Sequence, residues 1–469
     1  MATSPAPLSF SAFVMNTTGH ITQGTWRRPD AQQHRFNELD HWVELAKTLE
    51  RGKFDFIFFA DVIGLYGEFD GAHRIFAEAG LQIPSNDPSS ILSALAYETD
   101  TIGLAFTSAL LQEHPFNFAR RVSTLDHASK GRIAWNIVTG HNANGYRNYG
   151  FDDLLEHDER YRWADEYVEV VYKLWEGSWG DDALVIDKER GIVADPTKIH
   201  RINHDGSRYK VEGPHLVAPS PQRTPLLFQA GSSPAGRNFA ARNAEAQFLQ
   251  TPNPQIASST IQDTEALLPQ YGRQAGDLLF FQGLSFVVGS TEAAAKRKET
   301  ELDDDIEAAA MLAHLGGAIG VDFSGYALDA PLDDIQTEGA QSILEWARQS
   351  VSGRKATVRD LGLLNSRTSR LVGTPEQIAD ELEVWRAAGI DGVNLINHTI
   401  PGTYTEFIDQ VMPVLRERGL AQSEYGPGET LRERVFGTSR LNERHPARKY
   451  HNAFTANSIA DRTTTPAQV

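Results

Sequence analysis

Residues 102–138 have the sequence IGLAFTSALLQEHPFNFARRVSTLDHASKGRIAWNIV. This stretch begins and ends with short apolar runs, Ile102–Thr107 and Ile133–Val138, which have the length and character of strands buried on both faces. Pro115–Ala128, between them, has the apolar spacing of a helix. A strand, a helix and a second strand in this order predict two parallel neighbours in one sheet, joined by a crossover helix.

The same alternation continues on both sides of this stretch. Further strands are expected at Leu8–Val14, Phe54–Phe59, Pro225–Gln229, Ala246–Gln250, Leu278–Val288 and Gly392–Asn397. Helices are expected at Phe36–Arg51, Ile91–Tyr97, Asp158–Trp175, Asn238–Asn243 and Thr403–Arg418. Eight strands that alternate with helices predict an α/β fold of the (β/α)₈ TIM-barrel type.

A doubly wound open sheet is the structural alternative. Such a sheet usually carries a G-x-G-x-x-G phosphate loop after its first strand. Here the first strand is followed by Met15-Asn16-Thr17-Thr18-Gly19-His20, which lacks that pattern. The barrel is therefore favoured.

Several long stretches exceed what a minimal barrel needs. Residues 1–425 are expected to form one barrel domain with insertions at about 140–160, 186–221 and 318–369. Long insertions of this kind usually form lids or binding loops, and 318–369 is the expected lid. Residues 426–469 are expected to form a C-terminal arm, which either wraps a neighbouring subunit or is mobile.

Composition excludes several classes of function. Lys and Arg number 44 against 62 Asp and Glu, a formal charge of -18, and no basic stripe offsets it, so nucleic acid is an unfavourable partner. The absence of cysteine excludes disulfides and thiolate chemistry. No histidine spacing typical of a metal site occurs, and no metal is expected. The first residues lack the regions of a signal peptide and no apolar run is long enough to span a bilayer, so a cytoplasmic location without membrane attachment is expected.

Candidate site residues follow from the barrel itself, because functional side chains of such barrels lie at the carboxyl ends of the strands. Asp61 follows the second strand, Thr107 ends the third, and Asn136 lies in the fourth among apolar neighbours. Each of them, taken singly, is equally well interpreted as a cap for the helix that follows.

The segment Gly231-Ser232-Ser233-Pro234-Ala235-Gly236-Arg237 is the most informative. It joins a strand to a helix start, where free N–H groups and two hydroxyls favour an anion. Its glycine spacing resembles that of a P-loop, the Walker A motif G-x-x-x-x-G-K-[ST], but Arg237-Asn238 replaces Lys-Ser/Thr. A single phosphate group therefore fits this site better than a metal-bound triphosphate. His157 and Tyr161 share a helix face four residues apart and could donate to that phosphate; a capping network around Asp158 is the alternative.

These motifs and four further segments follow one another in a characteristic order. The four segments are Leu49-Glu50-Arg51-Gly52-Lys53-Phe54-Asp55, Gly131-Arg132-Ile133-Ala134-Trp135-Asn136-Ile137-Val138-Thr139, Glu156–Tyr161 and Gly373-Thr374-Pro375-Glu376-Gln377-Ile378-Ala379. The chain resembles the nitrilotriacetate monooxygenase and dibenzothiophene-sulfone monooxygenase family of the bacterial-luciferase-like superfamily. The resemblance covers about residues 8–425.

This resemblance implies the oxygenase component of a two-component flavin monooxygenase. A separate NAD(P)H-dependent flavin reductase would supply reduced FMN, which would react with O2 so that one oxygen atom passes to a small organic substrate. It implies that Asp61, Thr107 and Asn136 surround the flavin ring and ribityl chain, and that His157, Tyr161, Ser232 and Ser233 hold the phosphate. No catalytic acid or base is assigned. A homodimer or homotetramer is expected.

Substrate identity does not follow from the resemblance. The chain departs from many relatives at Val138-Thr139-Gly140-His141 and at His114-Pro115-Phe116, both expected to border the substrate space. The aromatic residues Phe13, Phe58, Phe59 and Trp135 favour an apolar or aromatic substrate or else fill the barrel; organosulfur and amine compounds are also open. A deazaflavin-dependent oxidoreductase of the same fold and a non-catalytic flavin-binding protein are the alternative functions.

Overall fold

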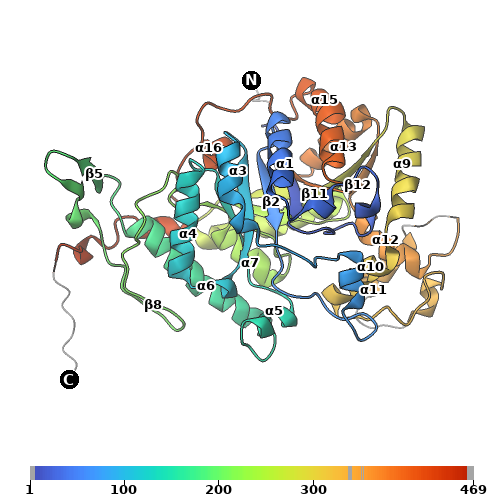
Figure 1. Ribbon diagram of the computed structural model, residues 1–469, viewed down its shortest axis with the longest axis horizontal. Helices are drawn as coiled ribbons and strands as arrows, with labels where there is room; N and C mark the ends of the chain where they lie inside the picture. Colours follow the sequence, from blue (N-terminus) through green and yellow to red (C-terminus); the bar gives the residue numbers. More distant parts are fainter. Residues whose placement is uncertain (1–5, 336–340, 350, 352, 462–469) are drawn as a thin grey trace.

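Eight parallel strands close into a barrel at the centre of the molecule (Figure 1). The structure is a computed structural model that describes residues 6–335, 341–349, 351 and 353–461. The barrel strands are β1 (Ser9–Met15), β2 (Phe56–Ala60), β3 (Gly103–Ala109), β4 (Ile133–Val138), β9 (Leu226–Gln229), β10 (Ala246–Leu249), β11 (Leu279–Val288) and β13 (Gly392–Ile396). The pairing of β10 with β11 closes the sheet, and the predicted barrel is confirmed.

Helices surround the barrel on its outside. Those that follow or precede the barrel strands are α1 (Leu39–Arg51), α3 (Leu92–Glu98), α4 (Pro115–Ala128), α6 (His157–Tyr172), α7 (Pro234–Asn243), α8 (Pro254–Glu265), α9 (Glu292–Asp305), α13 (Pro375–Ala387), α14 (Gly402–Glu406) and α15 (Met412–Glu417). No helix in the described part of the chain is long and apolar enough to cross a membrane.

The core has two layers because successive side chains of a strand point to opposite faces. In β2, Phe56 and Phe58 belong to the cluster inside the barrel. Ile57 and Phe59, between and after them, pack in the outer layer against the helices. A strand buried on both faces must be apolar throughout, which explains the continuous apolar run in the sequence.

Short strands outside the barrel were not predicted from the sequence. β12 (Arg370–Gly373) extends the sheet by pairing with the second half of β11. Within the predicted insertion at 186–221, β5 (Leu184–Asp187) pairs with β6 (Ile192–Ala194), and β7 (His204–Asp205) pairs with β8 (Lys210–Val211). These strands are short and mostly part-exposed, so they lack the apolar run that marks the barrel strands.

The remaining helices decorate the two ends of the barrel. α2 (Arg74–Ala79), α5 (Ala143–Asn148), α10 (Ala308–Ile319), α11 (Gln341–Gln349) and α12 (Val358–Arg367) stand at the end opposite to α16 (Leu431–Phe436) (Figure 1). The predicted insertion 318–369 contains α11 and α12, which share a small apolar core with α10 around Leu312, Leu344 and Leu361. Residues 336–340, 350 and 352 of the predicted lid lie outside the described residues.

The C-terminal segment closes the amino end of the barrel. Leu431 of α16 packs inside the barrel against the aromatic cluster that includes Phe56 and Phe228. Gly103 makes room for it, because a Cβ there would lie 2.7 Å from Leu431 Cδ1. Residues 426–461 make many contacts within their own chain, with Leu431, Arg432, Leu441 and Ala447 buried. That the arm also wraps a neighbouring subunit stays a prediction.

A buried ion pair fixes this closure. Arg432 Nε donates to Glu245 Oε1 at 2.7 Å and Nη2 donates to Oε2 at 2.9 Å. The same guanidinium donates to the carbonyls of Pro225 and Gln222, at the start of β9. The pair is almost fully buried, so each charge depends on the other for compensation.

We expect Arg432→Met to lower the free energy of unfolding by about 3–5 kcal/mol, because it leaves Glu245 as an uncompensated buried charge. Urea unfolding followed by fluorescence measures the loss. The matched control is Arg74→Met, which breaks the exposed Arg74–Glu78 pair and should cost less than about 1 kcal/mol. Equal losses in the two variants would contradict a structural role for the buried pair.

Candidate functional site

A cavity of about 500 Å³ opens at the carboxyl ends of the barrel strands. Its wall is formed by residues of β1, β2, β3, β4, β10, β11 and β13, of helices α7 and α8, and of the segments that follow β2, β9 and β10. The lining residues are Phe13, Phe58, Ala60, Asp61, Thr107, Asn136, Val138, Ala230, Ser232, Arg237, Phe248, Leu249, Gln250, Thr251, Thr260, Gly283, Asn394 and Ile396. Four of the residues singled out from the sequence, Asp61, Thr107, Asn136 and Ser232, are among them.

Thr107 and Asn136 form the polar floor of this cavity. They are opposite one another on β3 and β4, and Asn136 Nδ2 donates to Thr107 Oγ1 at 3.0 Å. Asn136 Oδ1 is buried and has no hydrogen-bond partner in the described part of the chain. A buried acceptor without a partner is costly, so it is best explained by a ligand group that donates to it.

Asp61 lies at the end of β2, on the same wall. Burial and, to a lesser extent, the nearby charge of Asp87 raise the pKa of its carboxyl to about 7. Hydrogen bonds from the backbone N–H of Val62 and from Gln112 oppose this shift. Asp61 therefore exchanges a proton near neutral pH, which an ordinary aspartate does not.

The predicted phosphate residues meet at the start of α7. Ser233 caps this helix, its Oγ accepting from the N–H of Gly236 at 3.1 Å. His157, the first residue of α6, lies with Nε2 3.1 Å from the same Oγ. Its Nδ1 is 3.1 Å from Asp158 Oδ1, so the capping contact considered from the sequence exists beside the contact to Ser233.

Tyr161 reaches the same point because two glycines leave it room. A Cβ on Gly231 or on Gly236 would lie 2.8 Å from the Tyr161 hydroxyl. Burial raises the pKa of this phenol, so it stays protonated and can donate. Hydroxyl, imidazole and helix N–H groups thus converge on one small region, which suits an anion with several oxygen acceptors.

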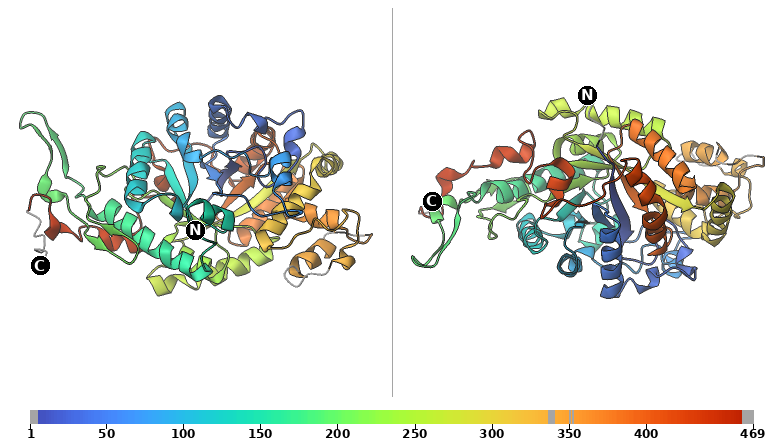
Figure 2. Two further views of the ribbon diagram at one scale, coloured as in Figure 1. Left: turned by 60° about the horizontal axis from the view of Figure 1, so that its bottom comes forward. Right: turned by 90° about the horizontal axis from the view of Figure 1, so that it is seen from above.

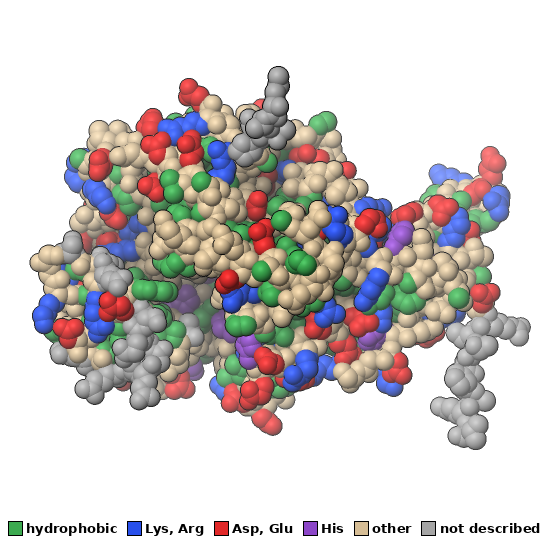
Figure 3. All heavy atoms as spheres, turned by 180° about the vertical axis from the view of Figure 1, so that it is seen from behind, with side chains coloured by type: hydrophobic (Ala, Val, Ile, Leu, Met, Phe, Trp, Pro, Cys, Tyr) green, Lys and Arg blue, Asp and Glu red, His purple; other side chains and the backbone are tan. Residues whose placement is uncertain are grey.

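Sequence reasoning named His141 but missed the polar side chains near it, His20, Tyr66 and His314, which come from segments far apart in the chain. The ring centroid of Tyr66 lies 5.1 Å from that of His141 and 4.8 Å from that of His314 on α10. The ring of His20 is tilted against that of the cavity residue Phe13, and their centroids are 4.6 Å apart. Figure 3 shows histidine side chains around a hollow on one face of the molecule. No fixed spacing links these positions, so only the fold brings them together.

These side chains are neutral at physiological pH. Burial lowers the pKa of His20 to about 3 and that of His314 to about 4, and it raises the pKa of Tyr66 to about 12. The Nδ1 atoms of both histidines are buried without a partner among the described residues. The group can therefore exchange hydrogen bonds with a neutral molecule without adding charge. No cluster of three or more potential ligands among the described residues is placed to hold a metal ion.

Of the four aromatic residues that the sequence suggested for the cavity lining, two face the cavity and two do not. Phe13 and Phe58 face the cavity. Phe59 packs outward on Trp42 at 5.3 Å, and Trp135 packs outward on Phe118 at 4.5 Å. The reason is strand alternation, since Phe58 and Phe59 are consecutive and must point to opposite faces.

The two departures from the family pattern have different places in the structure. Val138, Gly140 and His141 line a small cavity of about 60 Å³ beside Asp61. His114 instead caps α4 at the surface and meets Tyr209 edge-on. None of residues 114–116 lines the barrel-mouth cavity or the small cavity, so the expectation that they border the substrate space stays a prediction.

Comparisons with known proteins agree with this arrangement. The model of the family "Luciferase-like monooxygenase" matches residues 12–392. Dimethyl-sulfide monooxygenase of Hyphomicrobium sulfonivorans is 42% identical over 97% of this chain and 96% of its own. The crystal structure of DmoA from Hyphomicrobium sulfonivorans superposes with a TM-score of 0.92 at 41% identity, covering 98% of this chain and 99% of that one.

Two further relatives are similar over nearly their full lengths. Long-chain alkane monooxygenase of Geobacillus thermodenitrificans is 42% identical over 95% of this chain and 98% of its own. A riboflavin lyase, crystallised with modified FMN and riboflavin, has a TM-score of 0.84 at 38% identity, covering 95% and 99% of the two chains.

The narrower resemblance is confirmed as well, since a dibenzothiophene-sulfone monooxygenase and a nitrilotriacetate monooxygenase component are 36% and 35% identical. With a family model that matches most of the barrel and relatives of this similarity, the chain belongs to the luciferase-like monooxygenase family.

Proposed function

We propose that this monooxygenase is the oxygenase component of a two-component system, which binds reduced FMN supplied by a separate NAD(P)H-dependent flavin reductase and oxygenates a small organic substrate. The observation that carries the proposal is the barrel-mouth cavity with an anion cradle beside it, formed by Ser233, His157 and Tyr161. A flavin mononucleotide has one ring system and one phosphate, which fit this pair of features.

Each residue expected from the sequence has a role in this proposal. Asp61, Thr107 and Asn136 surround the ring and ribityl chain, where the free Oδ1 of Asn136 can accept from a flavin N–H or hydroxyl. Ser232, Ser233, His157 and Tyr161 hold the phosphate. Arg237 lines the same cavity but is paired with Asp263 at 3.1 Å, so it adds little free charge.

The bound reduced flavin would supply the two electrons with which dioxygen is activated. The chain orients this cofactor and keeps water away. The α10 helix packs on the segment that follows β2, where its Gly317 lies against the Tyr66 backbone; a Cβ there would be 3.1 Å from the Tyr66 carbonyl oxygen. We propose that α10–α12 act as the lid expected from the sequence.

The substrate side of the cavity is apolar with neutral polar groups at its edge. Phe13, Phe58 and Phe248 supply the apolar wall. His20, which contacts Phe13, and the neighbouring Tyr66 and His314 do not line this cavity; we propose that they offer uncharged hydrogen-bonding groups to a substrate that extends past Phe13. This chemistry favours a small apolar or weakly polar molecule, such as an organosulfur compound, over a polycarboxylate. The names of the dimethyl-sulfide and long-chain alkane monooxygenases agree with this choice.

Assembly is part of the proposal. The β5–β6 hairpin projects from the body beside the last described residues (Figure 2). Leu184, Ile186 and Val193 on it are 47%, 54% and 67% exposed. A two-stranded hairpin with free edges and exposed apolar side chains is poorly stable in water, and most oligomers are formed by identical chains. We propose that a second copy covers this hairpin in a homodimer or homotetramer. A cytoplasmic location stays a prediction.

We expect oxygen uptake that depends on both reduced FMN and substrate when the protein is mixed with a flavin reductase, NADH and a panel of sulfides and alkanes. In the same assay His314→Phe should raise the substrate KM and leave the FMN dissociation constant unchanged. Hydride transfer with a deazaflavin and no response to reduced FMN would instead establish the deazaflavin alternative. Flavin binding without turnover on any substrate would establish a flavin-binding protein.

Ser233→Ala and Tyr161→Phe should each weaken FMN binding by about 1 kcal/mol or more, roughly fivefold in Kd, because each removes a hydrogen bond to a charged phosphate. Fluorescence titration with FMN measures the effect. Ser258→Ala on α8 and Tyr97→Phe on α3 are the matched controls, since neither residue lines the cavity. Wild-type affinity in both test variants would remove the phosphate assignment.

Val193→Ser, combined with Ile186→Ser, should lower the association state seen by sedimentation velocity, because it removes the apolar surface that a second copy would cover. Ile256→Ser, on an exposed position of α8, is the control and should leave the association state unchanged. A double variant that sediments like the wild type would show that the hairpin does not hold the copies together.

A further inference from the structure

Three hollows lie in series beside Asp61. The first is a groove of about 930 Å³ on the outside of the barrel, lined by residues of α3, α4 and the end of β3. The second is the small cavity of about 60 Å³, and the third is the barrel-mouth cavity. Thr107 borders all three, Gln112 borders the first two, and Asp61 borders the last two. These shared side chains of the barrel wall therefore separate the groove from the barrel-mouth cavity, which is the flavin cavity of the proposed function.

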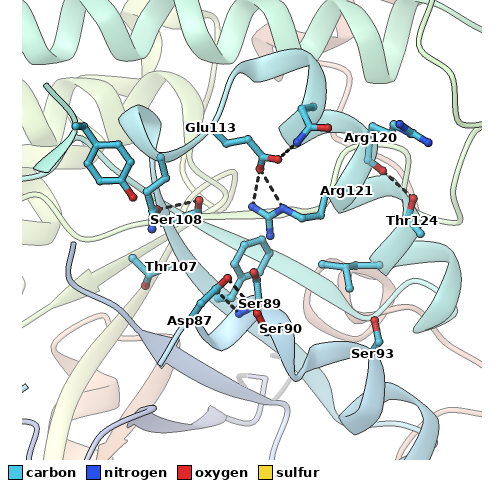
Figure 4. A pocket seen from close by; sticks show the side chains of 15 residues that line it. Asp87, Ser89, Ser90, Ser93, Thr107, Ser108, Glu113, Arg120, Arg121 and Thr124 are labelled. Carbon is cyan, nitrogen blue, oxygen red and sulfur yellow. Dashed lines mark hydrogen bonds and ion pairs between the residues drawn. The ribbon is translucent and has the colours of Figure 1, made fainter. Parts of the chain in front are cut away.

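The groove is polar and accessible to water. Figure 4 shows Asp87, Ser89 and Ser90 on one side of it and the paired Glu113 and Arg121 on the other. Asp87 is exposed and caps the short 3₁₀ turn Pro88–Ser90, accepting from the N–H of Ser89 at 2.8 Å. Hydroxyl, carboxylate and guanidinium groups of this density favour ordered water, which can carry protons.

Asp61 is the inner end of this path. Gln112 Nε2 donates to its Oδ2 at 3.5 Å, and Gln112 Oε1 accepts from Ser108 Oγ at 3.1 Å, so the amide spans from the groove to the carboxylate. The titratable groups around Asp61 are Asp87 on the groove side, Tyr149 after α5, and His141 in the small cavity. None of them brings a positive charge, since burial lowers the pKa of His141.

No other residue that lines the flavin cavity, within the described part of the chain, can give up a proton near neutral pH. The lining includes two ionisable side chains, Asp61 and Arg237, and an arginine does not release its proton in proteins. Burial strongly lowers the pKa values of His20 and His314, which lie next to Phe13 and Tyr66. Both imidazoles are therefore already neutral near pH 7 and do not act as acids there.

We propose that Asp61 delivers to the flavin cavity the proton that the oxygenation consumes, and that it regains this proton from water in the groove between α3 and α4. The inference rests on the proposed function. One anionic reduced flavin, one dioxygen, one substrate and one proton give oxidised flavin, water and the oxygenated product. The flavin and the substrate each provide two electrons. One oxygen atom ends on the substrate, and the other forms water with the flavin hydrogen and the proton from Asp61.

Because a proton path through the side wall is separate from the barrel mouth, the mouth can stay closed by α10–α12 while the proton enters. Water is then kept from the reacting flavin without depriving the reaction of its proton. Phe13, Phe58 and Ile396, which also line the barrel-mouth cavity, have no group suited to this transfer.

Asp87→Asn tests the path without touching the flavin cavity. The asparagine oxygen preserves the cap on Ser89 but removes the negative charge beside Asp61. The flavin-free protein is titrated by infrared difference spectroscopy, following the protonated carboxyl band that is missing from Asp61→Asn. We expect this band in the wild type to titrate near pH 7 and to move down by about half a pH unit in Asp87→Asn.

The second measurement is the rate of flavin oxidation in a single turnover with reduced FMN, oxygen and saturating substrate, as a function of pH. A donor must be protonated, so the wild-type rate should fall as the pH rises through about 7, and Asp87→Asn should fall at lower pH by the same shift. Asp61→Asn at saturating FMN should be slower and lose this dependence. Asp152→Asn, an exposed change of equal charge, should behave like the wild type.

The outcomes separate the two proposals. If the wild type oxidises reduced FMN with substrate but the Asp87→Asn profile and band coincide with those of the wild type, the path through the groove is wrong and the function stands. If Asp61→Asn keeps the wild-type pH dependence, Asp61 is not the donor. If the wild type shows no substrate-dependent oxidation of reduced flavin, the proposed function fails, and the proton path fails with it.

Discussion

The parallel closure of the barrel is the constraint on which the site depends. Once β10 pairs with β11 and β1 pairs with β13, every strand ends on the same rim. Residues that the chain separates widely, such as Asp61 after β2 and Ser232 after β9, then line one cavity. An open sheet would place the ends of these strands along a line instead of around a ring, and no cavity would form between them.

The two ends of the barrel differ in how their buried polar groups are compensated. At the amino end, Leu431 packs against the aromatic rings inside the barrel, and the buried charges of Arg432 and Glu245 compensate each other. At the carboxyl end, buried polar atoms such as Asn136 Oδ1 and His314 Nδ1 have no hydrogen-bond partner among the described residues. Unpaired buried groups destabilise a fold, so a tightly packed opposite end offsets the cost of keeping a site ready for ligands.

Burial also sets the electrostatics of the cavity. It keeps His20 and His314 uncharged and Tyr66 protonated, and it moves the titration of Asp61 toward neutrality. A cavity with few net charges suits an apolar substrate, while a single carboxyl that gains and loses a proton near pH 7 suits a reaction that consumes one. In the proposed reaction the cofactor would carry the redox chemistry, and the protein would position it, exclude water and supply the proton.

The sequence by itself determined the barrel and the local turn at Ser232-Ser233-Pro234 to which we assign the phosphate. Strands buried on both faces need continuous apolar runs, which are visible without a structure, and Ser232-Ser233-Pro234 contains its own turn, cap and helix start. Tertiary structure alone decided the rest. His20, Tyr66, His141 and His314 meet only because the barrel brings the loops after β1, β2 and β4 against α10. Phe59 and Trp135 face outward because successive side chains of a strand point to opposite faces of the barrel wall. The start of the C-terminal arm packs on its own barrel, where Arg432 pairs with Glu245. Contacts between distant segments depend on register and closure, which no local pattern of residues encodes.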